Sequence, residues 1–170
     1  MSRPRRIVIV GFMGCGKSTV AKALARRLDC DMIDLDTYIT EQENRSPAEL
    51  IAQDGEAAFR ALETGALRNI LKQRDWRVIA LGGGAWTIAA NRALIRKSNC
   101  LTVWLNAPFE LCWQRIISKG KSARPLAPNR KRALALFTSR KPKYRSTDLH
   151  ISADGKRAAL LASEIEGYLS

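Results

Sequence analysis

A glycine-rich loop between a short apolar run and an amphipathic segment restricts the fold of this chain more than any other feature. The loop, Gly11–Ser18, fits the pattern G-x-x-x-x-G-K-[ST]. The β-branched run Ile7–Val10 precedes it and is typical of a buried strand, and Val20, Leu24 and Leu28 recur every four residues after it, as on a helix. Because motif and context agree, a chance glycine-rich turn is the weaker reading. The sequence predicts a strand, a phosphate-binding loop and a helix, and hence a site for a nucleoside triphosphate.

Within this loop the residue types match the needs of a polyphosphate. Backbone N–H groups and the positive end of the following helix surround the phosphates. We expect Lys17 to reach the β- and γ-phosphates and the Ser18 hydroxyl to ligate Mg²⁺. The residues expected to hold the nucleotide here are Gly14, Cys15, Gly16, Lys17, Ser18 and Thr19.

The length of 170 residues and a hydrophobic content of 46% predict one globular domain, 1–170. No apolar stretch approaches the ~18 residues that cross a bilayer, and the basic start leads directly into the first strand without room for a signal peptide. The four cysteines lack metal-site spacing and are expected to be reduced core thiols. We therefore expect a cytoplasmic protein that does not bind membranes.

The net charge of +13 is concentrated in one segment. Ten Lys or Arg residues and no Asp or Glu occur between Lys119 and Arg145, which leaves about +3 (13 minus 10) for the other 143 residues. Such a segment could bind nucleic acid, hold a polyphosphate and an anionic substrate, or be a solvated face without a partner. Composition alone leaves these three open.

Apolar runs alternate with helical patterns along the chain, which predicts an α/β fold of three layers around a parallel sheet. The long basic stretch Lys119–Asn129, with Gly120, Pro125 and Pro128, predicts a lid covering about 117–130. The expected strands are near 6–10, 31–35, 77–81, 101–105 and 149–152, and the expected helices near 17–28, 36–44, 46–53, 56–73, 88–97, 108–118, 130–140 and 156–169.

Two aspartates follow the second expected strand. Because side chains alternate along a strand, Asp34 and Asp36 point the same way and Leu35 the other, at the strand's carboxyl end, where open α/β sheets bind ligands. Asp36 could instead cap a helix that begins at Thr37, which would explain one aspartate but not both. The functional reading assigns Asp34 to Mg²⁺ and Asp36 to the substrate hydroxyl under attack.

Arginines and glycines make up the remaining candidates. Arg60 and Glu63, three apart on a helix, form either a surface ion pair or a braced guanidinium for an anionic substrate. The triplet Gly82–Gly84 after a buried strand favours close approach of a ligand to the backbone. Arg124 in the lid and Arg140 suit a phosphoryl group and a carboxylate.

Two further side chains complete the sequence interpretation. His150 is interpreted as structural or surface. Trp86 is interpreted as packing, or as a border of the substrate pocket.

Taken together and in this order, these motifs resemble the shikimate kinase family over nearly the whole chain. The resemblance implies a nucleoside-monophosphate-kinase-like P-loop fold with a five-stranded parallel sheet flanked by helices, a lid, and a helical substrate-binding segment about 34–63. It implies transfer of the γ-phosphate of ATP, with Mg²⁺, to the 3-hydroxyl of shikimate on the way to chorismate.

The same resemblance implies roles for individual residues. Catalytic residues are Lys17, Asp36 and Arg124; the acid is held by Asp36, Arg60, Gly82, Gly83 and Arg140; Ser18 and Asp34 manage the metal; Arg115 and Arg124 join the loop in holding ATP, with Arg115 against adenine. The chain departs from the family pattern at Ala127, at Lys143 and in the length between Arg115 and Arg124.

Two rival functions fit parts of the pattern. One is a related P-loop kinase that acts on another hydroxy acid, such as gluconate, or on a nucleotide. The other is a non-catalytic ATP-sensing or nucleic-acid-binding module built on 119–145, which has no need of Asp34, Asp36 or the triple glycine. We expect a monomer that binds shikimate and no nucleic acid.

Overall fold

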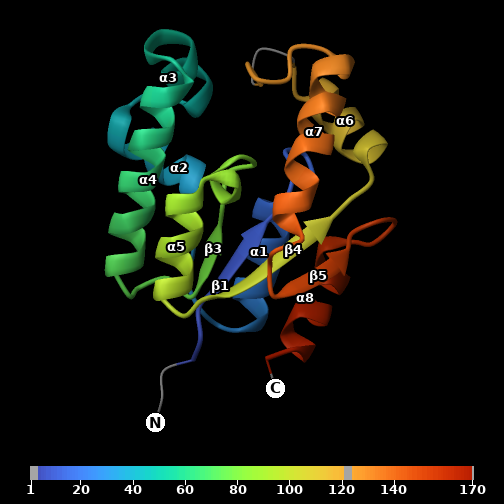
Figure 1. The fold of residues 1–170 in the computed structure, drawn as a ribbon. Helices are drawn as coiled ribbons and strands as arrows, with labels where there is room; N and C mark the ends of the chain where they lie inside the picture. The colour runs from blue at the N-terminus through green and yellow to red at the C-terminus, as the bar shows by residue number, and fades with distance from the viewer. Residues whose placement is uncertain (1–3, 121–123, 170) are drawn as a thin grey trace.

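The computed structural model describes residues 4–120 and 124–169, and its centre is a five-stranded, wholly parallel sheet (Figure 1). The strand order is β2-β3-β1-β4-β5, so the strand before the glycine-rich loop is central. The strands are β1 (Ile7–Val10), β2 (Met32–Asp34), β3 (Val78–Ala80), β4 (Leu101–Asn106) and β5 (Leu149–Ser152).

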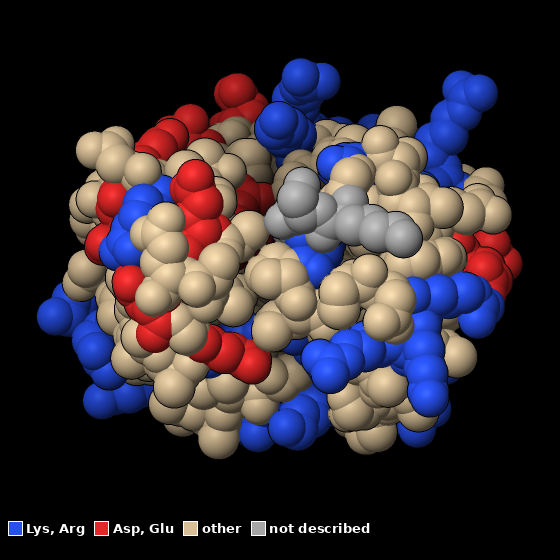
Figure 2. All heavy atoms as spheres, turned by 90° about the horizontal axis from the view of Figure 1, so that it is seen from above, with Lys and Arg blue, Asp and Glu red and all other residues tan. Residues whose placement is uncertain are grey.

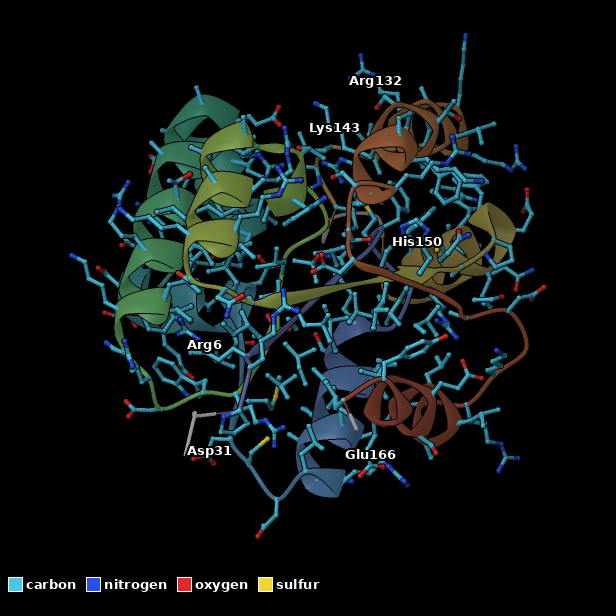
Figure 3. The ribbon with its side chains drawn as sticks, turned by 60° about the horizontal axis from the view of Figure 1, so that its bottom comes forward. Arg6, Asp31, Arg132, Lys143, His150 and Glu166 are labelled. Carbon is cyan, nitrogen blue, oxygen red and sulfur yellow. The ribbon has the colours of Figure 1, made fainter. Side chains whose placement is uncertain are left out.

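Helices cover both faces of this sheet. Helices α1 and α8 pack against each other on one face, and α4 and α5 lie on the other (Figures 1 and 3). The helices are α1 (Lys17–Arg27), α2 (Leu35–Glu43), α3 (Pro47–Asp54), α4 (Glu56–Lys72), the 3₁₀ turn η1 (Ala85–Thr87), α5 (Ala89–Lys97), α6 (Phe109–Ser118), α7 (Arg130–Tyr144) and α8 (Ala158–Gly167).

The central strands are apolar on both faces because helices cover both. Every residue of β1 and β3 is buried, and β1 pairs with β3 (Ile7 beside Val78) and with β4 (Ile7 beside Leu101). Since all five strands run the same way, their carboxyl ends meet at one edge. The loops that leave this edge carry the candidate site.

The expected α/β architecture and all the expected strands and helices are confirmed, with three local differences. Helix α7 continues past 140 to Tyr144, through Pro142. Tyr144 is buried, and its hydroxyl donates to the Gly83 carbonyl oxygen, so its contacts hold the last turn despite the N–H that proline lacks. The turn η1 directly after the triple glycine was not expected.

The second strand ends earlier than the sequence suggested. Asp34 is the N-cap of α2, with its side chain accepting from the Thr37 N–H at 3.2 Å, and Asp36 lies in the first helical turn. The strand-alternation argument for this pair was therefore wrong, and so was the idea that Asp36 caps a helix beginning at Thr37. A cap at Asp34 leaves Asp36 free for other contacts.

Other expectations concern cysteines and membranes. All four cysteines are free thiols; Cys15, Cys100 and Cys112 are buried, and burial raises the pKa of Cys112 to about 12. Across 4–120 and 124–169, no helix is long and apolar enough to span a bilayer.

Candidate active site

Two adjoining cavities lie at the carboxyl edge of the sheet. The larger, about 580 Å³, follows the phosphate loop, and the smaller, about 70 Å³, lies between α3, α4 and α7. Both are lined by Met13, Asp36, Gly83 and Arg124, so these residues mark the junction. Seen from above, acidic side chains gather mostly over α2–α4 and basic ones over α6 and α7 (Figure 2). We name the two spaces the nucleotide cavity and the acid cavity.

The phosphate loop has the backbone that its glycines predict. Gly14 and Gly16 have φ of 78° and 96°, and Gly16 is the N-cap of α1. A Cβ on Gly14 would lie 2.7 Å from the Cys112 carbonyl oxygen. The Nζ of Lys17 is buried and donates to the carbonyl oxygens of Gly11 (2.9 Å) and Phe12 (3.0 Å). The loop's own carbonyls thus hold the lysine at the wall of the larger cavity.

The expected metal ligands lie side by side. The Ser18 hydroxyl donates to the Asp34 carboxylate, whose other oxygen caps α2. A hydroxyl and a carboxylate on the wall of a polyphosphate cavity are the hard oxygen donors that Mg²⁺ prefers, so this pair fits the ion. No cluster of three or more His, Cys, Asp or Glu side chains exists in the described part of the chain. A metal ion at this pair would therefore have few protein ligands and would need phosphate oxygens as further ligands.

Asp36 lies at the junction of the cavities. Withdrawal from water raises its carboxyl pKa above the usual range; nearby Asp34 adds to the increase, and Lys17, Arg124 and Arg60 oppose it. A carboxylate with a raised pKa that faces cations is suited to accept a proton from a hydroxyl.

Arg60 is braced, not exposed as a simple surface pair. Its Nη1 donates to Glu63 Oε1 at 2.8 Å, and its Nη2 lies 3.6 Å from Glu56 Oε1. Glu63 is 1% exposed, and burial raises its pKa while Arg60 lowers it. Because the pair is buried and lines the acid cavity, the reading as a surface ion pair is wrong.

Arg140 lies across the acid cavity with an unused donor. It is 6% exposed, its Nη1 is buried, and this atom has no hydrogen-bond partner in the structure. Burial lowers its pKa; the nearby Tyr144 hydroxyl opposes this decrease, and the positive charge of Arg60 adds to it. Arg60 and Arg140 both line this cavity, and Arg140 has an N–H without a hydrogen-bond partner. An anion can therefore bind between the two guanidinium groups.

The triple glycine makes space for the site's own charged side chains. A Cβ on Gly82 would lie 2.8 Å from Asp36 Oδ1, and one on Gly83 would lie 3.1 Å from the Met13 nitrogen. A Cβ on Gly84 would overlap the guanidinium of Arg60. None of the three has a positive φ, so the absent side chain is what matters here. The glycines therefore make room for protein side chains, and the close approach of a ligand to this backbone stays a prediction.

The nucleotide cavity also contains residues that sequence reasoning missed. Arg115 lines it as expected, and its Nη1 donates to the Gly14 carbonyl oxygen at 3.1 Å. The segment between β5 and α8 and the first turns of α8 line the same cavity, through Ala153, Lys156, Arg157, Ala158 and Leu161. Its place at the carboxyl end of a strand next to β4 was the available signal.

Two residues lie outside the site. His150 packs edge-on against Trp104 at 5.3 Å and its Nε2 contacts the Arg145 carbonyl, which confirms a structural role. Trp86 is buried, and its Nε1 donates to the Lys143 carbonyl oxygen at 2.9 Å. It lines neither cavity, so it packs the core and does not border the substrate pocket.

A sequence model described as shikimate kinase matches residues 13–169. The chain belongs to the shikimate kinase family. It is 42% identical over 168 residues to a shikimate kinase of Geobacter sulfurreducens, covering 97% of this chain and 91% of that one. It is 37% identical to the enzyme of Persephonella marina, with 97% and 99% covered. As a member of this family the chain is an ATP-dependent phosphotransferase.

Solved structures agree. A shikimate kinase from Acinetobacter baumannii in complex with shikimate superposes with a TM-score of 0.90 at 30% identity, covering 98% of this chain and 93% of that one. A gluconokinase from Sinorhizobium meliloti has a TM-score of 0.67 at 18% identity, which reflects a shared fold alone.

Proposed function

We propose that this protein transfers the γ-phosphate of ATP to the 3-hydroxyl of shikimate, giving shikimate 3-phosphate and ADP. The observation that carries the proposal is the buried, unpartnered Nη1 of Arg140 in a cavity shared with Arg60 and joined to the phosphate loop. A ring acid with a carboxylate at one end and a hydroxyl at the other fits between these cations and Asp36.

The acid is held by its carboxylate. Arg60 and Arg140 donate to the two oxygens, while Glu63 keeps the Arg60 guanidinium in its orientation. Gly82 and Gly83 let the ring lie against the backbone. In this orientation, the 3-hydroxyl of the bound acid lies away from the two arginines and faces the phosphate loop.

The proton of the attacking hydroxyl goes to Asp36. As the oxygen bonds to the γ-phosphorus, the bond from this phosphorus to the β–γ bridging oxygen breaks and ADP leaves. Asp36 must be ionised to accept the proton, and its raised pKa makes it a stronger base than an ordinary carboxylate.

Charge on the transferring group is neutralised from two sides. Lys17 exchanges the carbonyl oxygens of Gly11 and Phe12 for phosphate oxygens, and Arg124 reaches the same group from the segment 117–130, which acts as a lid. Residues 121–123 of that segment lie outside the described structure. Arg115, which lines the same cavity, holds the nucleotide as well.

Mg²⁺ bound through Ser18 and Asp34 would supply a positive charge on the phosphate oxygens. The residue types of the pair support this assignment.

We further propose that the enzyme works as a monomer in the cytoplasm, with no nucleic-acid or membrane partner.

The test is a coupled assay of ADP release. ATP consumption should require shikimate and should be absent with gluconate or nucleoside monophosphates at the same concentration. Equal turnover with gluconate would overturn the assignment of the acid cavity. ATP hydrolysis independent of any acceptor, together with steeply salt-dependent RNA binding, would favour a module that does not transfer phosphate.

A further inference from the structure

A second arginine-lined cavity lies at the opposite edge of the sheet. Its volume is about 570 Å³, close to that of the nucleotide cavity. Figure 3 shows Arg6 at this end of the molecule, away from Arg132 and Lys143 of α7. The lining residues precede or lie near the amino ends of β1, β3 and β4; they are Pro4, Arg5, Arg6, Arg74, Asp75, Trp76, Arg77, Ser98 and Asn99.

Backbone carbonyls hold two of these arginines in place. Arg5 donates to the carbonyl oxygens of Asn99 and Cys100, each at 3.1 Å, and Arg6 donates to two carbonyls at the end of α4. Carbonyl groups orient a guanidinium without cancelling its net charge. The ion pair that Arg5 makes, with Asp148 at 3.8 Å, is long and half exposed.

The positive charge of the cavity is largely uncompensated. Arg74 and Arg77 make no ion pair within the part of the chain that the structure describes, and Asp75 is the one carboxylate in the lining. Asp31 contacts Arg77 through its backbone, its carbonyl oxygen accepting from the Arg77 N–H at 3.1 Å.

Arg77 also shares a feature with the acid cavity. In the described residues, two buried side-chain nitrogens lack a hydrogen-bond partner: Nη1 of Arg140 and Nε of Arg77. The first lies where the substrate carboxylate is expected. The second belongs to Arg77, a residue that lines this far cavity together with three other arginines.

We propose that this cavity binds a small polyanion, a molecule that carries two or more phosphate or carboxylate groups. Four guanidinium groups, two of them held by backbone carbonyls, suit planar, multiply charged oxygen groups, and Trp76 offers an apolar wall for the remainder of such a ligand. This inference is independent of the proposed function, because no residue of the cavity belongs to the active site.

The test is calorimetric titration of the whole protein with pyrophosphate and, separately, with citrate. The active site is first filled with a non-hydrolysable ATP analogue and shikimate. The doubly substituted variant Arg74→Gln, Arg77→Gln should bind either probe at least about tenfold more weakly. Arg68→Gln removes the same charge from an exposed position on α4 that does not line the cavity, and it should bind like the unaltered protein.

Each outcome decides the proposal. One equivalent of probe that is lost in the double variant and weakened by added salt supports it. Binding of pyrophosphate but not citrate restricts the ligand to phosphates, and the reverse restricts it to carboxylates. No binding, or equal binding by both variants, overturns it. Because Arg77 is partly buried, Arg74→Gln alone is also titrated, and unchanged affinity in this variant contradicts the proposal even if the double variant unfolds.

Discussion

The two adjoining cavities are prepared for their ligands in opposite ways. In the acid cavity, Glu63 accepts a hydrogen bond from Arg60 and fixes its guanidinium. The Nη1 of Arg140 has no hydrogen-bond partner and is available to a ligand. In the nucleotide cavity the polar side chains already form hydrogen bonds with protein groups. Lys17 donates to loop carbonyls, and the Ser18 hydroxyl donates to Asp34.

This difference follows from burial. The acid cavity is small, and the charged side chains Glu63 and Arg140 that line it are buried, so they cannot turn to water and must be fixed by the fold. The nucleotide cavity is large, and its groups can exchange one partner for another at little cost. We therefore expect substitutions on the acid side to change substrate affinity, and those on the nucleotide side to change turnover.

The largest effect is expected at the junction, from Asp36→Asn. Turnover should fall about 10³-fold, because the amide cannot take the hydroxyl proton. The same variant should melt at a higher temperature at pH 7, because an ionised carboxyl with a raised pKa destabilises the folded state. ADP release and scanning calorimetry measure the two effects.

The raised pKa of Asp36 also predicts how the stability of the protein changes with pH. Its folded pKa lies above its unfolded value, so the free energy of unfolding of the unaltered protein should fall as pH rises between the two values. The corresponding limb of activity should lie above the pH expected for an ordinary aspartate. An Asp36→Asn enzyme with full turnover would show that the base is elsewhere.

Lys17→Met tests the nucleotide side. Turnover should fall about 10²-fold or more, because the charge that meets the γ-phosphate is lost. Shikimate affinity, measured by calorimetry, should change little, since Lys17 does not line the acid cavity. Lys22→Met, an exposed change on the same helix, is the control. A large loss of shikimate binding in Lys17→Met would contradict the expectation that the two cavities control affinity and turnover separately.

Arg140→Lys tests the acid side. The KM for shikimate should rise about 10²-fold while the KM for ATP stays within a few-fold, because an ammonium cannot reproduce the guanidinium geometry. Steady-state kinetics with each substrate varied separates the two constants. Arg132→Lys, on the exposed side of α7, should leave both unchanged. An equal rise in both KM values would argue that Arg140 supports the fold rather than the acid.

Gly84→Ala tests whether the triple glycine makes room for Arg60. A methyl group there overlaps the guanidinium, so the arginine must move and the KM for shikimate should rise about tenfold. Gly65→Ala is matched in chemistry, has open space around the added carbon, and lies within α4. It should raise the melting temperature without changing kinetics. Identical kinetics in both variants would contradict this role of Gly84.

The smallest effect is expected from Tyr144→Phe. The hydroxyl donates to the Gly83 carbonyl oxygen, and the ring packs against Trp104 with centroids 5.9 Å apart. Removing the hydroxyl keeps the packing but frees the Gly83 peptide, so the KM for shikimate should rise a few-fold. A lower melting temperature with unaltered KM would assign the tyrosine to stability alone.

Much of the fold was predictable because its signals are local. The β-branched run before Gly11 and the helical spacing after Lys17 each indicate one element, and the structure contains both. The extension of α7 to Tyr144 was not predictable. It depends on contacts of that side chain with Gly83 and Trp104, which are distant in the sequence.

The candidate site was predictable as a set of residues but not as a geometry. The reason given for pairing Asp34 with Asp36 was wrong, because a helix cap ends the strand one residue early. The burial of Glu63 and the free Nη1 of Arg140 arise from packing between helices that no local pattern reports. The segment after β5 was missed because its residues carry no motif.

The most direct test of the account compares shikimate with its neutral carboxamide by calorimetry. The unaltered protein should bind the acid about 10²-fold more tightly, because Arg60 and Arg140 meet a carboxylate. In Arg140→Met this preference should fall to a few-fold. If the unaltered protein binds the amide as tightly as the acid, the carboxylate does not lie between these arginines and the central claim is contradicted.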